Sequence, residues 1–254
     1  MIVKVLGCSG GIGDKLRTTS LLVGEHILID AGTGVGDLSI EQLLKIDHIF
    51  VTHSHLDHIA CIPFLLDTVI GMRPNPVTVH ATKATINALK QHIFNWVIWP
   101  DFNAIPTVNE PFLQYDEICL AQSINLAGLT ITVLPANHVV PAVGYQIDSG
   151  ANSLIFTGDT TSCDALWAVV NKIENLQYIL IETAFSDSEL ELAKVSKHFC
   201  PSMLADDLDK LIVSAEVFIT HLKPIDSHII LQEISHSIVN RTCKALKNNQ
   251  EFNL

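Results

Sequence analysis

The sequence predicts an α/β fold, and two observations support this class. Short apolar runs typical of buried strands alternate along the whole chain with segments of helical periodicity. The 254 residues are 48% hydrophobic and only 17% charged, which allows a sizeable core and argues against disorder. No linker, low-complexity tract or break in composition interrupts the chain, so we expect a single domain over residues 1–254.

The first half of the chain contains the signals of strands and helices in turn. Strands are predicted at residues 2–7, in a hairpin over 20–32, and at 47–55 and 77–81, and helices at 39–46, 57–72 and 83–98. Gly24 and Glu25 form the hairpin turn, and Ser39 is a typical N-terminal cap. Pro63 fits a helix that begins near Cys61, because proline is tolerated in the first turn.

The second half repeats this alternation. Strands are predicted at residues 128–138, in a hairpin over 142–160, and at 176–185 and 215–224, and helices at 163–173, 188–198, 201–212 and from 225 onward. Polar residues occur at the carboxyl ends of the predicted strands, namely His53, His55, His138, Asp159, Glu182 and His221. Sites in α/β proteins gather at such strand ends, so we expect these side chains to form one site.

The stretch "FVTHSHLDHIACIP" (residues 50–63) indicates metal binding. Residues two apart in an extended segment point the same way, so His53 and His55 can bind one ion, while Asp57 and His58 point toward a second. Imidazole and carboxylate donors favour Zn²⁺, Mn²⁺ or Fe²⁺. The alternative is a run of polar residues on a solvated loop. Four such groups directly after an apolar strand form a far more specific pattern than a single pair of histidines, so we favour metal binding.

The motif "THSHLDH" resembles the hallmark of the metallo-β-lactamase superfamily, and "LPANH", "LIFTGDT" and "VFITHLKP" match its later motifs. The resemblance implies a four-layer αβ/βα sandwich with two divalent metal ions, zinc favoured over manganese or iron. It assigns one ion to His53, His55 and His138, the other to Asp57, His58 and His221, and the bridging position to Asp159. Asp30 in "ILIDAGTG" is similar to the superfamily's early aspartate, and the resemblance implies that it either supports the ligands or has a structural role.

Within the superfamily, the chain is similar to tRNA 3′-end endonucleases and class II cyclic-nucleotide phosphodiesterases. Leu56 in "HLDH", "IET-F" and "HLKP" favour the latter, whereas Cys61 departs from the small glycine or serine of that signature. The resemblance implies that Glu182 and His198 deliver a proton to the leaving group, alongside a catalytic Asp57. A solvated histidine at a helix end is the alternative for His198. Lys223 is a candidate phosphate contact or a solvated lysine.

The predicted activity is hydrolysis of 3′,5′-cyclic nucleotides such as cAMP or cGMP to 5′-mononucleotides by a metal-bridged hydroxide. The alternatives are an RNA-end phosphodiesterase of the tRNA 3′-processing type, a thioester or lactone hydrolase, and a metal-binding protein without activity. The net charge of −12 disfavours binding to nucleic acid, and no long basic insertion is present. A nucleophilic role for Cys61 is not expected.

The remaining expectations concern location and partners. The six scattered cysteines are typical of reduced thiols, and neither a signal peptide nor a membrane span is apparent, which predicts a cytoplasmic protein. The resemblance implies a homodimer. The aromatic segment 92–102 is a core helix and loop, a wall for a nucleobase, or a dimer surface. The glycines of "GCSGGIG" (residues 7–13) do not match a nucleotide-binding motif and are expected to allow a close backbone approach.

Overall fold

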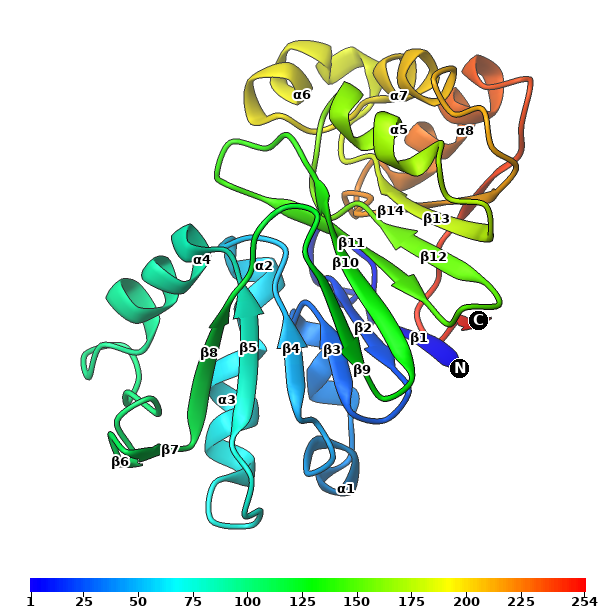
Figure 1. Cartoon of the computed structure of the whole chain (residues 1–254). Coiled ribbons are helices and arrows are strands. Elements are labelled where there is room, and N and C mark those ends of the chain that lie inside the picture. Colours follow the sequence, from blue (N-terminus) through cyan, green and yellow to red (C-terminus); the bar gives the residue numbers. More distant parts are fainter. The chain divides into compact units, whose positions relative to one another are not determined.

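The computed structural model describes all residues from 1 to 254, and the chain divides into two compact units. The first unit comprises Met1–Gly7, Arg17–Ile118 and Asn248–Asn253, and the second comprises Cys8–Leu16 and Cys119–Lys247 together with Leu254. Each unit contains one seven-stranded sheet with helices (Figure 1), which confirms the predicted α/β class. The expectation of a single domain stays a prediction.

The sheet of the first unit has the order β16-β1-β2-β3-β4-β5-β8. Its strands are β1 (Ile2–Gly7), β2 (Ser20–Val23), β3 (Ile27–Ile29), β4 (His48–Phe50), β5 (Val77–Ala81), β8 (Leu113–Glu117) and β16 (Glu251–Asn253). The strands β3, β4, β5 and β8 are parallel, so their carboxyl ends share one edge. β1 pairs with β16, which places the two ends of the chain on neighbouring strands.

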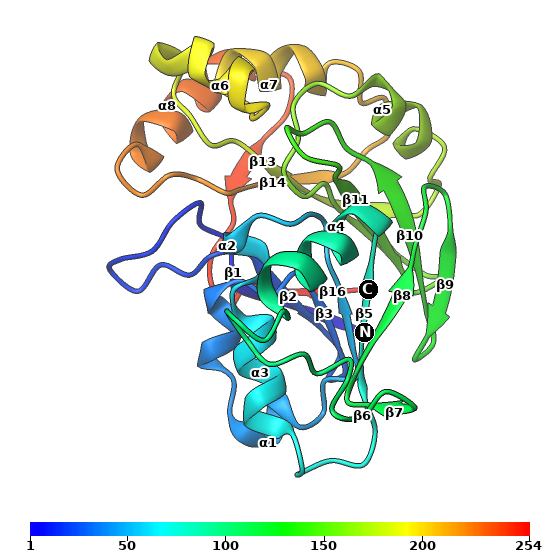
Figure 2. The same cartoon turned by 90° about the vertical axis from the view of Figure 1, so that its left-hand side faces the viewer.

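Helices cover one face of this first sheet. They are α1 (Ile40–Leu43), α2 (Leu56–Ile59), α3 (Cys61–Val69) and α4 (Lys83–Ala88), with a 3-10 turn η1 (Thr33–Asp37) and a π-helical turn η2 (Leu89–Ile93). Leu65 and Leu66 of α3 belong to the same buried core as Val77 and Val79 of β5, and Figure 2 shows α1 and α3 together on this side of the sheet. A short hairpin of β6 (Pro106–Thr107) and β7 (Glu110–Pro111) completes the unit.

The sheet of the second unit has the order β15-β14-β13-β12-β11-β10-β9. Its strands are β9 (Ser123–Leu126), β10 (Leu129–Pro135), β11 (Val143–Asp148), β12 (Ser153–Phe156), β13 (Leu176–Glu182), β14 (Glu216–Thr220) and β15 (Cys243–Ala245). The helices are α5 (Asp164–Val170), α6 (Leu190–Ser196), α7 (Pro201–Leu208) and α8 (Ser227–Ser237), with a 3-10 turn η3 (Asp187–Glu189). Trp167, Leu204 and Ile230 bring α5, α7 and α8 into a core with β13 and β14.

Several predicted elements are shorter in the structure, and the prediction of a helical segment from residue 225 onward is wrong beyond Ser237, where the strands β15 and β16 follow α8. The strand predicted over residues 47–55 ends at Phe50, so His53 and His55 lie in the loop that follows and not on a strand. The helix predicted over 83–98 ends in the π-helical turn at Ile93. Phe94 leaves the helical path because its ring is buried with Phe102 in the core. No helix of the structure is both long enough and apolar enough to span a membrane.

Candidate metal centre

The first unit gathers four side chains of types that can bind a metal ion beyond the end of β4, namely His53, His55, Asp57 and His58. The rings of His53 and His55 lie 4.7 Å apart between centroids, and those of His53 and His58 lie 4.3 Å apart. His58 Nε2 lies 3.7 Å from Asp57 Oδ2. His53 and His58 are fully buried, whereas His55 and Asp57 are half-buried, so within this group only the latter two are accessible to solvent.

Asp30 and Thr52 orient the histidines of this group. Asp30 is fully buried and accepts hydrogen bonds from His58 Nδ1 at 2.7 Å and from the Thr52 hydroxyl at 2.8 Å. Because that hydroxyl donates to Asp30, its oxygen accepts from His53 Nδ1 at 3.0 Å. Both histidines therefore carry a lone pair on Nε2, the form in which imidazole binds a metal. Burial raises the pKa of Asp30, and the neighbouring His58 counteracts this rise.

The second unit supplies His138, Asp159 and His221, which follow β10, β12 and β14. His138 Nδ1 donates to the carbonyl of Lys197 at 3.1 Å, and since a carbonyl only accepts, the lone pair of this ring lies on Nε2. Asp159 Oδ1 lies 3.3 Å from His221 Nδ1, and a ligand atom of His138 lies within 4.8 Å of the Asp159 carboxylate. Asp159 thus lies between two histidines, as a bridging ligand would.

A buried acid–base pair adjoins these ligands. His198 Nδ1 lies 2.6 Å from Glu182 Oε1, and the His198 ring contacts those of His138 at 4.9 Å and His221 at 5.3 Å between centroids. Burial raises the pKa of Glu182 to about 7. Burial alone would lower the pKa of His198, but the charge and hydrogen bond of Glu182 outweigh this, so the pKa of His198 is raised. His198 is only 8% exposed, so the alternative of a solvated histidine is wrong.

The donors in both units fit divalent metal ions of the borderline class. Each unit presents imidazole nitrogens together with one carboxylate. Ligand atoms lie within 4.8 Å of each other for His53 and His55 and for Asp57 and His58 in the first unit, and for Asp159 with each of His138 and His221 in the second. Hydrogen bonds on Nδ1 fix three of the rings with Nε2 available, which is the arrangement that protein-bound metals require of their histidines. The residues present therefore fit the metals that the sequence predicts.

Two further predicted residues have defined surroundings. Lys223 is half-buried, and its ammonium donates to the carbonyl of Gly10 at 3.0 Å. Cys61 is half-buried on α3, and burial raises the pKa of its thiol, as expected of a thiol without a nucleophilic role. The sequence did not indicate Thr52 or the Lys197 carbonyl. Thr52 could have been found, because it directly precedes the histidine motif in the sequence. The Lys197 carbonyl could not, because every residue has a backbone carbonyl and the sequence does not show which one accepts a hydrogen bond.

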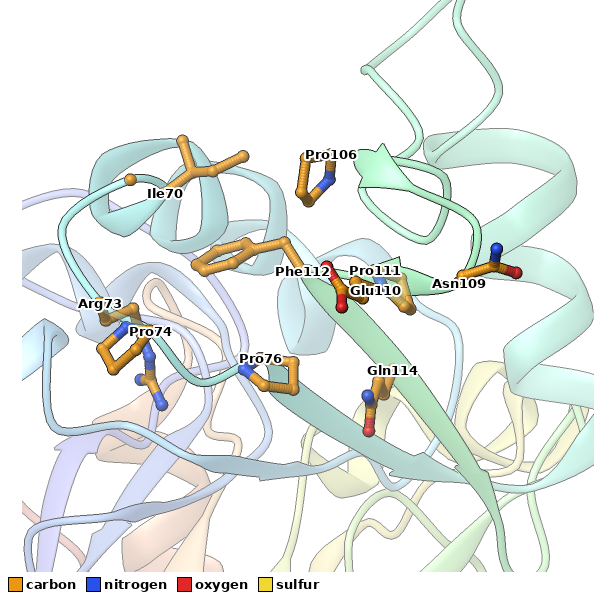
Figure 3. A pocket seen from close by; sticks show the side chains of 11 residues that line it. Ile70, Arg73, Pro74, Pro76, Pro106, Asn109, Glu110, Pro111, Phe112 and Gln114 are labelled. Atoms are coloured by element: carbon orange, nitrogen blue, oxygen red, sulfur yellow. The ribbon is translucent and has the colours of Figure 1, made fainter.

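A large cavity lies elsewhere in the first unit and holds none of these residues. It measures about 640 Å³ and adjoins the amino ends of β5 and β8, the edge of the sheet opposite to His53. Figure 3 shows its walls, which include four prolines and Phe112. Arg73 is not available to an anion there, because its guanidinium is bound by the carbonyls of Leu44 and Ile46 and by Asp47. The walls of this cavity therefore differ in chemistry from the imidazole and carboxylate groups of the candidate metal centre.

The chain is similar in sequence to proteins that are named as a phosphodiesterase and as nucleases. The chain is 25% identical to the "Probable 3′,5′-cyclic-nucleotide phosphodiesterase" of Yersinia pestis, over 87% of this chain and 78% of that protein. It is 32% identical to ribonuclease Z of Clostridium beijerinckii over 56% of this chain, and the match spans about half, 47%, of that enzyme. Among solved structures, yeast PDE1 has a TM-score of 0.82 with 18% identity, over 100% of this chain and 99% of that one.

The model of the β-lactamase superfamily domain matches residues 25–247, which is most of the chain. That range includes the predicted metal ligands of both units. The fold of yeast PDE1 agrees with the match, and the two relatives carry the names of a cyclic-nucleotide phosphodiesterase and a ribonuclease Z. The chain belongs to the metallo-β-lactamase superfamily.

Proposed function

We propose that this protein is a metal-dependent phosphodiesterase that hydrolyses 3′,5′-cyclic nucleotides, such as cAMP or cGMP, to 5′-mononucleotides. The observation that carries the proposal is the buried Glu182–His198 pair, with a 2.6 Å contact, beside His138 and His221. Such a pair can protonate a leaving oxygen. The similarity to a protein named as a cyclic-nucleotide phosphodiesterase, over 87% of this chain, supports the choice of substrate.

The proposed metal ligands are those that the sequence predicts. His53, His55 and His138 would hold one ion, Asp57, His58 and His221 the other, and Asp159 both, with zinc as the favoured metal. The tautomers fixed by Asp30, Thr52 and the Lys197 carbonyl support this set. When bound, two divalent ions supply Lewis-acid stabilisation of the phosphate charge and activate water.

The chain's own residues would manage the proton. Glu182 accepts a hydrogen bond from His198 Nδ1, which orients the ring and favours its protonated form. His198 can then donate a proton from Nε2 to the departing 3′ oxygen, a step that contributes about 10²–10⁴-fold in typical enzymes. Lys223 lies close enough to His198 for its charge to counteract a part of the rise in the pKa of that imidazole, and we propose that this ammonium also attracts the substrate phosphate.

The acid–base pair distinguishes this reaction from thioester hydrolysis. A thiol has a pKa of about 8.5, so a thiolate leaves near neutral pH without a proton donor. An alkoxide is far more basic and does require one. The buried pair therefore favours an oxygen leaving group, as in a phosphodiester.

The second candidate is cleavage of RNA ends, favoured by the similarity to ribonuclease Z. The net charge of −12 opposes it, because extended RNA binding relies on a basic surface. That enzyme also extends beyond the match, which covers 47% of its length. We therefore place it second.

One experiment separates these candidates. The purified protein, with its metal content measured, is assayed side by side on cAMP, cGMP, bis(p-nitrophenyl) phosphate, precursor tRNA and a thioester. We expect the highest kcat/KM on a cyclic nucleotide and a product with a 5′ phosphate. Equal or higher turnover of tRNA or of the thioester would overturn the proposal.

We also propose a homodimer and a cytoplasmic location. Three consecutive apolar side chains are exposed, with 64% of Trp96, 84% of Val97 and 62% of Ile98 accessible, and such a surface is common where subunits meet. The helix predicted there ends at Ile93, and Phe94 and Phe102 are buried in the core, as the interpretation of a core helix and loop predicts. A base-stacking wall is the other alternative for the exposed side chains. All six cysteines are free thiols in the structure, which supports a reducing compartment. Light scattering of the wild-type protein and of Val97→Asp tests the dimer, with loss of the dimer expected for the variant.

A further inference from the structure

The glycine-rich loop after β1 lies along the segment that carries the metal ligand His221. The backbone N–H of His221 donates to the Cys8 carbonyl at 2.8 Å. The N–H of Gly10 donates to the Leu222 carbonyl at 3.0 Å, and Ser9 pairs with Leu222 in a parallel bridge. A stretch near the start of the chain thus continues the backbone pairing beyond the end of β14.

This pairing supports an unusual backbone conformation. His221 has a φ of +61°, in the left-handed region that residues with a Cβ atom rarely adopt. A residue stays in that conformation only where its surroundings hold it. Here the bonds to Cys8 and Leu222 lie on either side of the strained residue, so the loop is placed to hold it.

Gly10 is required by close packing against His221. A Cβ atom at this position would lie 2.6 Å from the His221 carbonyl oxygen, 3.1 Å from Cδ2 and 3.2 Å from Nε2. The first distance is shorter than real Cβ contacts, so a side chain would displace either the loop or the ligand. The opposite edge of the ring faces the carboxylate of Asp159, whose Oδ1 lies 3.3 Å from His221 Nδ1.

Lys223 links this loop by a hydrogen bond to the segment that carries His221. Its ammonium donates to the Gly10 carbonyl at 3.0 Å, two residues beyond His221. Gly10 is therefore bound through its N–H by Leu222 and through its carbonyl by Lys223. The loop and the ligand segment form one hydrogen-bonded unit.

We propose that Gly10 and Lys223 are positioning residues for His221, which they hold in the backbone and ring orientation needed by a metal ligand. The inference rests on the proposed metal centre. It gives the sequence "GCSGG" a role in metal affinity, and it gives Lys223 a role that does not depend on substrate.

The test compares Gly10→Ala with Gly36→Ala in the full-length protein. An added Cβ at Gly36 meets no atom within 4 Å, and this glycine is exposed, so the second variant is a matched control. Zinc binding to the metal-free proteins is measured by calorimetry and by metal content, without substrate. We expect Gly10→Ala to retain one ion and to bind the other about 10–100-fold more weakly, as when a group that supports a ligand is lost. Wild-type affinity for both ions in a folded Gly10→Ala protein would overturn the role of Gly10.

Lys223→Met provides an independent test should Gly10→Ala fail to fold. A lysine that only contacts substrate phosphate would leave zinc affinity unchanged, whereas a positioning lysine lowers it several-fold on removal. Unchanged zinc affinity in Lys223→Met overturns the role of Lys223, and overturns the whole proposal if Gly10→Ala does not fold. Failure of the proposed function is distinguishable, since a wild-type protein that binds two ions and hydrolyses no cyclic nucleotide would refute the substrate alone.

Discussion

His198 Nδ1 and Glu182 Oε1 lie 2.6 Å apart in the interior of the second unit. The same carboxyl group accepts from the backbone N–H groups of Thr160 and Phe199, so its position is fixed by three contacts. A carboxylate held in this way keeps the imidazole in one orientation. The pair therefore fixes the position and the orientation of the ring from which the proposed proton donation would occur.

Replacing His198 with alanine should slow the chemical step without removing metal. We expect kcat on a cyclic nucleotide to fall about 10²–10⁴-fold, the usual contribution of a general acid. Metal content measured on the same samples should stay at the wild-type value. Loss of metal from His198→Ala would instead make this residue a ligand.

Glu182→Gln should change the pH dependence of turnover. The carboxylate raises the pKa of His198, so its removal lowers that pKa, and His198 then loses its proton at a lower pH. We expect the alkaline limb of kcat to move to lower pH, with kcat reduced about 10-fold at its optimum. The pH profile of Glu191→Gln is the control, because Glu191 is exposed on α6. An unshifted limb in Glu182→Gln would argue against proton donation by His198.

Asp159→Asn should abolish turnover, because an amide is a weaker metal ligand and carries no charge to neutralise two cations. The expected metal content is below two ions per chain. Asp164→Asn in the same unit should behave as wild type, since that side chain is 86% exposed. If Asp159→Asn kept both ions and its activity, the dinuclear proposal would be wrong.

Asp30→Asn tests how the ligands are oriented. Asp30 accepts from His58 Nδ1 and from the Thr52 hydroxyl, and an amide nitrogen cannot accept either bond. We expect metal affinity to fall about 10–100-fold, measured by calorimetry. Asp67→Asn on the exposed side of α3 is the control. Equal affinities in the two variants would show that the bond to His58 does not orient the ligand.

Acid should destabilise the first unit through a buried histidine network. His80 Nδ1 donates to Asp116 at 2.8 Å, and His80 Nε2 lies 3.0 Å from His48 Nδ1. Burial lowers the pKa of both histidines below the value of about 6.5 expected for the unfolded chain. As the pH falls through 6.5 or so, the unfolded state binds protons first, so the free energy of unfolding decreases until the folded histidines are protonated as well.

Urea unfolding of the metal-free protein between about pH 7.5 and about pH 5.5 measures this effect. His80→Gln should show a shallower loss of stability with falling pH than the wild type. His92→Gln is the control, because His92 is exposed. Identical slopes for His80→Gln and the wild type would exclude the network as the cause.

The sequence predicted regular elements best where their own side chains decide the structure. The run "VTVHA" was predicted as a strand and is β5, Val77–Ala81, with four of its five residues buried. The predictions did not include β9 or β16, whose segments "SINL" and "EFN" contain few apolar residues. Both are edge strands, which exist because a neighbouring strand is present and not because of a local pattern.

The residues of the candidate site were predicted from their types and order along the chain. Imidazoles and carboxylates at the ends of apolar strands allow few other roles, because burying them without partners costs several kcal/mol. The amino-acid sequence thereby determined which groups the candidate site offers to metal ions. It also indicated Asp30 as a support for the ligands, and the structure shows its bonds to His58 and Thr52.

Only the tertiary structure decided how those residues are held. The Lys197 carbonyl fixes the tautomer of His138 across 59 positions of sequence, and Gly10 packs on the strained backbone of His221 from the other end of the chain. No local pattern encodes a carbonyl acceptor or the space that a missing Cβ leaves. Such contacts join segments that are far apart in the sequence and that meet only when the chain is folded. For that reason the role of "GCSGG" could be inferred only from the folded protein.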